Sequence, residues 1–214
     1  MKKTGSIFRI VKRSTDIAGA AVLLVAAAPV CVAAALMVKA ETPGPVIFIH
    51  RRTGKDGRDI SVYKFRSMHA GSEELESSLN DDQLEAYYRE YTLKDDPRVT
   101  KTGRLLRRTY LDELPQLYNI LHGEMSLVGP RPITRQELEL YTEDERRRLL
   151  SVKPGLTGYW QVFGKMRATY QNGERKRMEL FYSDHASAIF DLIILLLTPA
   201  SALNSIIKKG RGKN

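Results

Sequence analysis

The 214-residue chain has a single cysteine, Cys31, and few aromatic residues, which make up 8% of the sequence. One cysteine excludes an intramolecular disulfide and any zinc site built from several cysteines, and it fits a reducing compartment. Aromatic and basic residues do not alternate in the way that stacks nucleic-acid bases, so we expect no nucleic-acid partner. The sequence also lacks an internal repeat, a Walker-type glycine loop and cysteine–histidine metal spacing.

Basic residues are in excess. Lysine and arginine total 34 against 25 acidic residues, which gives a formal net charge of +9. Such an excess favours anionic partners, here anionic lipid or phosphorylated small molecules. The length suits one domain with a core of its own, together with attached segments.

Residues 17–38 form an apolar run of 22 residues without a charge. At about 1.5 Å per residue, a helix of this length can cross the core of a bilayer. Basic residues flank the run on both sides, and positive charge marks the cytoplasmic side of a membrane. Pro29, near the middle, removes a helix hydrogen bond. We therefore predict a re-entrant helix that breaks at Ala28–Pro29 and returns to the same face; an ordinary kinked span is the alternative.

Residues 42–66 predict a strand, a glycine-bracketed turn and a second strand. This hairpin carries Arg51, Arg52, Lys64 and Arg66 close to the predicted exit from the membrane. They can meet lipid head groups or the phosphates of a nucleotide. A solvated basic surface is the alternative.

The remaining segments predict mostly helical structure. Residues 71–96 are rich in acidic side chains and indicate an exposed helical excursion. Residues 135–151 predict helix, with a second helix start at Thr142 marked by a capping box. Residues 156–162 predict a turn followed by a strand. Residues 188–207 are apolar but interrupted, and they indicate an interfacial helix with a basic tail.

The most informative stretch spans residues 109–132, which contains the adjacent carboxylates Asp112 and Glu113. Arg107 lies just upstream, and Gly-Pro-Arg-Pro follows at 129–132. Carboxylates bind a cation, while arginines bind phosphate oxygens in bidentate fashion. The pattern predicts a site for a metal ion and a phosphorylated substrate. The alternative is a solvated helix start, with acids at the positive end of the dipole.

In their order along the chain, these stretches resemble the catalytic domain of the bacterial sugar transferases, the monotopic phosphoglycosyl transferases. The matching motifs are Lys12-Arg13-x-x-Asp16, Gly44–Phe48, Tyr63–Met68, Asp96–Val99, Leu106–Arg108, Leu111–Leu117, Met125–Pro132, and Lys153–Gly158 with Trp160–Val162. The resemblance covers nearly the whole chain.

The resemblance implies an α+β fold on the cytoplasmic face of the bacterial inner membrane. It would combine an N-terminal re-entrant helix-break-helix with a small β-hairpin or sheet and several amphipathic surface helices around one catalytic core. We expect residues 1–40 to form the basic N-terminus and membrane helix, residues 41–187 the catalytic domain, and residues 188–214 the interfacial helix and tail. The family often has Ser-Pro at the helix break, where this chain has Ala28–Pro29.

The resemblance also implies the transfer of a sugar 1-phosphate from a UDP-sugar to undecaprenyl phosphate, with release of UMP and with Mg²⁺ as cofactor. Asp112 would be the nucleophile, giving a phosphosugar-aspartyl intermediate, and a ligand of the metal. Glu113 would be its partner acid. The residues expected to hold substrate phosphate are Arg107, Arg131, Lys64 and Arg66. Glu179 stands where the family usually has a late aspartate.

The product would start the assembly of an exopolysaccharide, a capsule, an O-antigen or a glycoprotein glycan. Membrane lipids would be partners, and downstream glycosyltransferases and a second copy in a homodimer are further candidates. Three alternatives stay open. A classical glycosyltransferase is disfavoured because the chain has no Asp-x-Asp metal motif. A non-catalytic basic scaffold at the membrane surface and direct transfer in a ternary complex each make a different prediction for Asp112→Asn.

Overall fold

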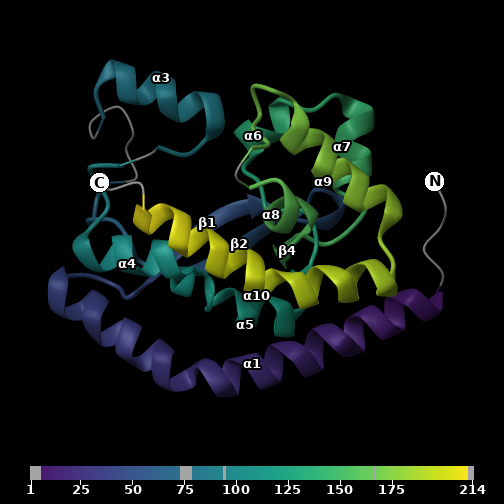
Figure 1. Ribbon diagram of the computed structural model, residues 1–214, viewed down its shortest axis with the longest axis horizontal. Coiled ribbons are helices and arrows are strands. Elements are labelled where there is room, and N and C mark those ends of the chain that lie inside the picture. The colour runs from purple at the N-terminus through teal and green to yellow at the C-terminus, as the bar shows by residue number, and fades with distance from the viewer. Residues whose placement is uncertain (1–5, 73–78, 94, 166, 212–214) are drawn as a thin grey trace.

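The computed structural model describes residues 6–72, 79–93, 95–165 and 167–211, and it confirms the α+β class (Figure 1). Strands β1 (Ile47–Thr53) and β2 (Asp59–Phe65) pair antiparallel, whereas β3 (Ser126–Val128) and β4 (Gly155–Thr157) pair in parallel. The helices are α1 (Ser6–Glu41), α3 (Asp81–Glu90), α4 (Lys101–Thr109), α5 (Gln116–His122), α6 (Arg135–Glu139), α7 (Glu143–Leu149), α8 (Tyr159–Phe163), α9 (Glu174–His185) and α10 (Ala188–Arg211), with 3₁₀ turns η1 (Lys55–Gly57) and η2 (Leu111–Glu113).

Helix α1 runs along one face of the molecule as a single helix of 36 residues, with Pro29 inside it. The predicted break at Ala28–Pro29 is therefore wrong at the level of secondary structure. The helix instead bends near its middle (Figure 1). Proline removes one hydrogen bond and crowds a carbonyl group one turn earlier, which bends a helix. The alanine-rich flanks have high helix propensity, so the helix resumes after the proline.

Near its start, α1 is tied to the rest of the molecule by Lys12, Arg13 and Asp16. The bonds run from Lys12 Nζ to Val128 O and Asp191 Oδ2, from Arg13 to Ile120 O and Leu121 O, and from Ser126 Oγ and Leu127 N to Asp16 Oδ1, all between 2.6 and 2.9 Å. Arg13 thereby binds carbonyl groups at the end of α5, which have no partner inside that helix. The Lys-Arg-x-x-Asp motif is a docking clamp.

The other end of α1 is also tied down. The Glu41 carboxylate accepts hydrogen bonds from the backbone N–H groups of Lys101 and Thr102, both at 2.8 Å. These groups lie at the start of α4, where N–H groups lack partners and the helix dipole favours negative charge. Arg66 donates to the carbonyl groups of Thr42 and Pro43, just beyond the end of α1. Both ends of α1 are therefore attached to one body.

The core lies where β2, α5 and β3 meet α1 and α10. Its most deeply buried apolar residues are Ala20, Val62, Leu117, Ile120, Met125, Val128, Tyr182 and Ile194. The parallel β3–β4 pair depends on close backbone approach, because a Cβ atom added at Gly155 would lie 2.0 Å from the nitrogen of Gly129. Only glycine permits this contact, and the contact fixes the path of the chain into Arg131.

Helix α10 continues through Pro199, so the expected interruptions do not divide it. One side of the helix carries polar groups that bond to the body. Thr198 Oγ1 lies 2.9 Å from Thr157 Oγ1, Ser201 Oγ donates to Val162 O, and Ser205 Oγ lies 2.6 Å from the Tyr110 hydroxyl. Apolar residues such as Leu196 and Leu203 are exposed on the helix. The helix is thus amphipathic, as the sequence predicts.

The other predicted segments are partly confirmed. The hairpin forms with the expected strands, and capping boxes start both α6 and α7. Residues 156–162 are mispredicted as turn and strand: β4 ends at Thr157 and α8 follows, closed by Gly164. A five-residue helix is too short to show periodicity in sequence. Within 71–96, α3 forms with an Asn80 capping box, while residues 73–78 lie outside the described residues.

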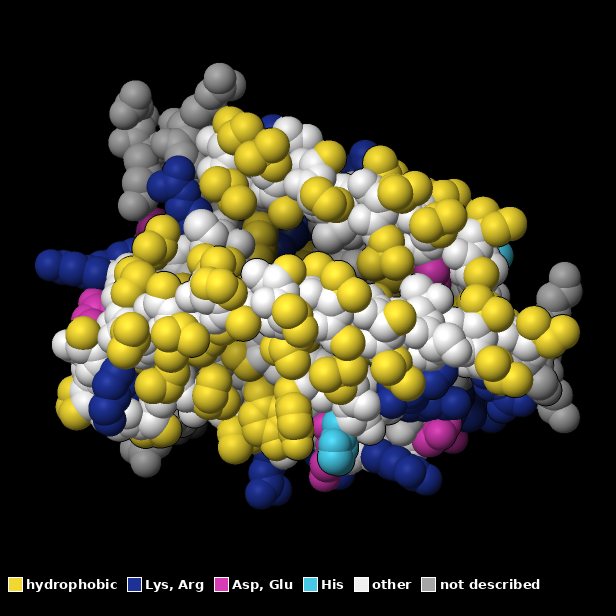
Figure 2. All heavy atoms as spheres, turned by 90° about the horizontal axis from the view of Figure 1, so that it is seen from below, with side chains coloured by type: hydrophobic (Ala, Val, Ile, Leu, Met, Phe, Trp, Pro, Cys, Tyr) yellow, Lys and Arg dark blue, Asp and Glu magenta, His cyan; other side chains and the backbone are white. Residues whose placement is uncertain are grey.

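One face of the molecule is strongly apolar. Figure 2 shows α1 crossing this face, with α10 lying along one side of it. Both helices are long and apolar enough to cross a membrane. The exposed apolar side chains include Val22, Leu23, Val25, Val32, Leu36, Leu192, Leu196, Leu203 and Ile207. Exposed apolar area on this scale marks a surface that contacts membrane or another protein.

Candidate active site

Asp112 and Glu113 lie on η2, a single 3₁₀ turn between α4 and α5. Tyr110, which ends α4, adopts a left-handed backbone conformation with φ at 61°. This conformation is uncommon for a residue other than glycine and redirects the chain at once. Pro115 follows the turn and precedes the first residue of α5. The turn separates the two carboxylates: Asp112 is buried, with 8% of its surface exposed, while Glu113 faces a pocket.

Glu113 is surrounded by cations. Its Oε1 accepts a hydrogen bond from Lys64 Nζ at 3.0 Å, and Arg131 Nη1 lies 4.0 Å from the same atom. Burial opposes ionisation, but the charges of Lys64, Arg131 and Lys165 outweigh it and hold the pKa of Glu113 at about 2. Glu113 is therefore a permanent anion that fixes two basic side chains in place.

Asp112 has the opposite environment. Burial raises the pKa of Asp112, and the negative charge of Glu113 raises it further, against the attraction of Lys64 and Arg107. A buried carboxylate beside a second carboxylate is stabilised in its charged form by any added cation. This arrangement suits a site that is completed by a cation, such as a metal ion that binds together with the substrate.

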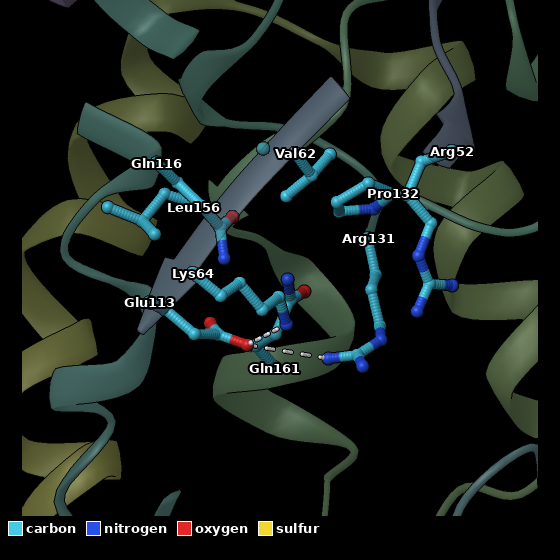
Figure 3. Close-up of a pocket in the computed structure, with 10 residues that line it drawn as sticks. Arg52, Val62, Lys64, Glu113, Gln116, Arg131, Pro132, Leu156 and Gln161 are labelled. Carbon is cyan, nitrogen blue, oxygen red and sulfur yellow. Dashed lines mark hydrogen bonds and ion pairs between the residues drawn. The ribbon is translucent and has the colours of Figure 1, made fainter. Parts of the chain in front are cut away.

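A small, open pocket lies beside Glu113. Lys64 from β2 and Arg131 from the segment after β3 point toward Glu113 from two sides of it (Figure 3). Its lining comprises Arg52, Val62, Lys64, Glu113, Gln116, Arg131, Pro132, Gly155, Leu156 and Gln161. Arg52 is paired with Glu137 at 2.6 Å, but Lys64 and Arg131 against the single charge of Glu113 still leave the pocket positive, which suits a phosphorylated ligand. Asp112 lies next to this lining, one residue from Glu113.

The structure separates the four cations that the sequence assigns to phosphate. Lys64 and Arg131 line the pocket. Arg107 on α4 is held by a 2.8 Å bond from its Nε to Ser67 Oγ, and its charge acts on Asp112. Arg66 is buried and bonded to the chain just beyond α1. The structure therefore does not bring Arg66 to the pocket. Arg66 instead stabilises the end of α1.

Glu179 lies underneath Arg131. It is 2% exposed, and its Oε2 accepts a hydrogen bond from the backbone N–H of Arg131 at 3.1 Å. Its other oxygen, Oε1, is buried and has no hydrogen-bond partner among the described residues. Burial raises the pKa of Glu179 to about 7, although Arg175 and Arg131 oppose this. The carboxyl group thus positions the Arg131 backbone from behind the pocket.

The donor chemistry of the site fits magnesium. Among the described residues, no group of three or more histidine, cysteine, aspartate or glutamate side chains could hold a metal. Magnesium, however, is commonly bound by one or two carboxylates together with substrate phosphates and water. Asp112 and Glu113 provide such a pair, and the buried position of Asp112 next to another anion favours a cation. Its binding stays a prediction.

The sequence profile of the bacterial sugar transferases matches residues 7–205. The chain belongs to this family. Among its relatives, the undecaprenyl-phosphate galactose phosphotransferase of Salmonella typhimurium is 41% identical over 193 residues, which are 89% of this chain and 40% of that protein. The UDP-glucose:undecaprenyl-phosphate glucose-1-phosphate transferase of Escherichia coli is 40% identical over 195 residues, 89% of this chain and 39% of that protein.

Family members differ in length. The chain spans about 40% of the two relatives above, but it matches 92% of the exopolysaccharide production protein ExoY of Rhizobium meliloti, with 40% identity over 210 residues. The resemblance found in the sequence is thereby confirmed. The family and the two exposed apolar helices together point to a membrane location.

Four residues near Glu113 are not singled out as ligands by the sequence: Arg52, Gln116, Gln161 and Lys165. Arg52 was visible only as part of a basic hairpin. Gln116 sits inside the Leu111–Leu117 motif but is buried, at 2% exposure, which sequence does not reveal. Gln161 and Lys165 follow β4, where the short helix α8 was not predicted. Only the fold brings these four near Glu113.

Proposed function

We propose that this chain transfers a sugar 1-phosphate from a UDP-sugar to undecaprenyl phosphate, giving undecaprenyl-diphosphate-sugar and UMP. One observation carries the proposal: a buried carboxylate, Asp112, lies next to a pocket where Lys64 and Arg131 converge on Glu113. The printed names of two relatives, which describe sugar-phosphate transfer onto undecaprenyl phosphate, support it. ExoY supports a role in starting exopolysaccharide assembly.

In the first step, a carboxylate oxygen of Asp112 attacks the phosphorus that bears the sugar. The bond from this phosphorus to the bridging oxygen breaks, and UMP leaves with that oxygen. Lys64, Arg107 and Arg131 supply positive charge around the reacting phosphate, which lowers the repulsion between carboxylate and phosphate. Magnesium, held by Asp112 and Glu113, would supply further charge neutralisation.

In the second step, a phosphate oxygen of undecaprenyl phosphate attacks the same phosphorus. The bond to Asp112 breaks, and the carboxylate is restored. No net proton is consumed, because one phosphate monoester enters and another has left. Division into two steps lets UMP depart before the lipid phosphate attacks.

The same proposal gives α1 a re-entrant course at the cytoplasmic face. Both ends of α1 are attached to one body, through Asp16 at its start and Glu41 at its end. With the body on one side of a bilayer, attachment of both ends excludes a simple span, and the exposed apolar middle of the helix then enters the bilayer and returns. The bend near the middle of α1 and its exposed apolar side chains are consistent with this course (Figures 1 and 2).

The test is intact-protein mass spectrometry after mixing the protein with magnesium and a panel of UDP-sugars, without lipid acceptor. We expect an added mass of one sugar phosphate that is lost in Asp112→Asn and kept in Asp59→Asn, whose carboxylate is exposed and paired with Arg135. UMP release only after undecaprenyl phosphate is added would indicate direct transfer in a ternary complex. A chain without turnover under any condition would be a membrane-surface scaffold.

A further inference from the structure

Lys165 connects three parts of the molecule. It follows α8, and its Nζ lies 3.8 Å from the centre of the Tyr110 ring. The Tyr110 hydroxyl in turn lies 2.6 Å from Ser205 Oγ on α10. Tyr110 is also the left-handed residue two positions before Asp112. The lysine is thus held between the turn that carries the carboxylates and the apolar helix α10.

The charge of Lys165 is only partly compensated. Burial lowers the pKa of Lys165, while the interaction with the Tyr110 hydroxyl and the charge of Glu113 raise it and the charge of Arg131 lowers it. Lys64 forms an ion pair with Glu113, and Lys12 forms one with Asp191. Lys165, by contrast, has no carboxylate within ion-pair distance among the described residues. A half-buried ammonium group without a counter-ion attracts an anionic ligand.

The apolar face of the molecule is hollowed beside α10, the helix to which Tyr110 is bonded. Figure 2 shows a hollow between α1 and α10, with basic side-chain atoms visible inside it. In the second half of α10, Thr198 and Ser205 bond to the body through their hydroxyl groups, whereas Leu196 and Leu203 are exposed on the same helix. A ligand with an apolar chain and an anionic end fits this hollow, with its chain between the two helices and its charged end pointing inward.

We propose that Lys165 binds the phosphate of the lipid acceptor, which reaches it through the hollow between α1 and α10. This assignment rests on the proposed function. The donor then occupies the pocket of Lys64, Arg131 and Gln161, whose lining does not include Lys165. The apolar chain of the acceptor thus reaches the site by a route separate from the donor pocket. Tyr110 holds the Lys165 ammonium group over its ring and is a positioning residue.

The experiment measures equilibrium binding of undecaprenyl phosphate and of neutral undecaprenol, by native mass spectrometry of the full chain in detergent micelles. We expect Lys165→Met to weaken binding of undecaprenyl phosphate about tenfold or more, with undecaprenol binding unchanged and with Lys165→Arg close to wild type. Lys208→Met removes an exposed lysine of α10 and is the matched control for bulk charge. It should bind both lipids as wild type does.

Three outcomes overturn the assignment. Unchanged binding of undecaprenyl phosphate by Lys165→Met shows that the lysine has no part in it. An equal loss for undecaprenol shows a packing effect. Weakened binding of UDP with intact lipid binding shows that Lys165 holds the donor phosphate. Because binding needs no turnover, these results are independent of whether Asp112 forms a covalent adduct.

A second measurement uses wild-type protein and so does not depend on a variant that folds. A polyprenyl phosphate with a photoreactive group next to its phosphate should cross-link to residues 198–205 or to the Gly164–Lys165 connection. Excess undecaprenyl phosphate should compete, and excess undecaprenol should compete less. Cross-links confined to other segments would contradict the proposed route.

Discussion

The side chain at position 179 reaches the backbone N–H of Arg131 and leaves its second oxygen buried without a partner among the described residues. Glutamate is one methylene longer than the aspartate usual in the family, and here the carboxyl group is enclosed, with 2% of the residue exposed. An acid whose native pKa is raised loses stabilising free energy as pH rises, because the folded state holds the proton more tightly than the unfolded state.

For Glu179, the pH range in which this stability is lost runs from the ordinary pKa of 4.5 to the native value of about 7. Across it, Glu179→Gln should gain up to about 3 kcal/mol in free energy of unfolding relative to wild type. Thermal unfolding of both proteins at several pH values measures this difference. Glu139→Gln, an exposed control, should show a flat difference. A flat difference for Glu179→Gln would contradict the raised pKa.

The carboxylate pair gives a second prediction at this scale. Removal of divalent cations with EDTA should stop sugar-phosphate transfer, and added magnesium should restore it, because a magnesium ion at the carboxylate pair would neutralise charge on the reacting phosphate. Release of UMP from a UDP-sugar in the presence of lipid acceptor is the measurement. Full activity in EDTA would remove the metal from the proposal.

Polar groups near the start of helix α1 attach it to the body in addition to its apolar contacts, and Asp16 is the most buried of these polar groups, at 4% exposure. Asp16→Ala would leave Ser126 Oγ and the N–H of Leu127 without this acceptor. We expect a loss of about 2–4 kcal/mol, since unsatisfied buried donors are costly. Chemical or thermal unfolding in micelles measures it.

Asp82→Ala, at an exposed position in the first turn of α3, is the matched control and should cost under about 1 kcal/mol. Partition into membranes should be the same for both variants, because the apolar surface of α1 is unchanged. An equal and small loss for both would show that the clamp contributes little to stability.

The whole molecule has its apolar face on one side and its acidic α3 well away from it (Figure 1). The proposed re-entrant course places both ends of α1 on the side of the body. In a background with Cys31 replaced by alanine, single cysteines at Arg9, Lys39 and Glu143 should all react with an impermeant thiol reagent from the same side of a vesicle. All three positions are exposed.

Opposite labelling of Arg9→Cys and Lys39→Cys would instead establish an ordinary kinked span. Glu143→Cys lies on α7 and reports the side on which the body lies. It therefore distinguishes a re-entrant helix from a protein inserted in mixed orientations, in which all three cysteines would label partially from both sides.

The family, the α+β class, the apolar helices, the hairpin and the position of Asp112–Glu113 in the chain were all predictable from the amino-acid sequence. These features depend on local signals: hydrophobic length, alternation, capping residues and contiguous motifs. The local signals overestimated the effect of Pro29 on the continuity of α1, because the effect of one proline on a long helix depends on the residues and contacts around it. They also missed α8, which is too short to leave a periodic pattern.

The contacts of each charged residue, by contrast, follow from the fold. Lys64 and Arg66 are two residues apart on β2, yet Lys64 binds Glu113 and Arg66 binds the chain beyond α1. Adjacent Asp112 and Glu113 have pKa values shifted in opposite directions, because burial and neighbouring charges come from distant segments. Burial and charge partners are properties of the folded molecule, and residue spacing does not encode them.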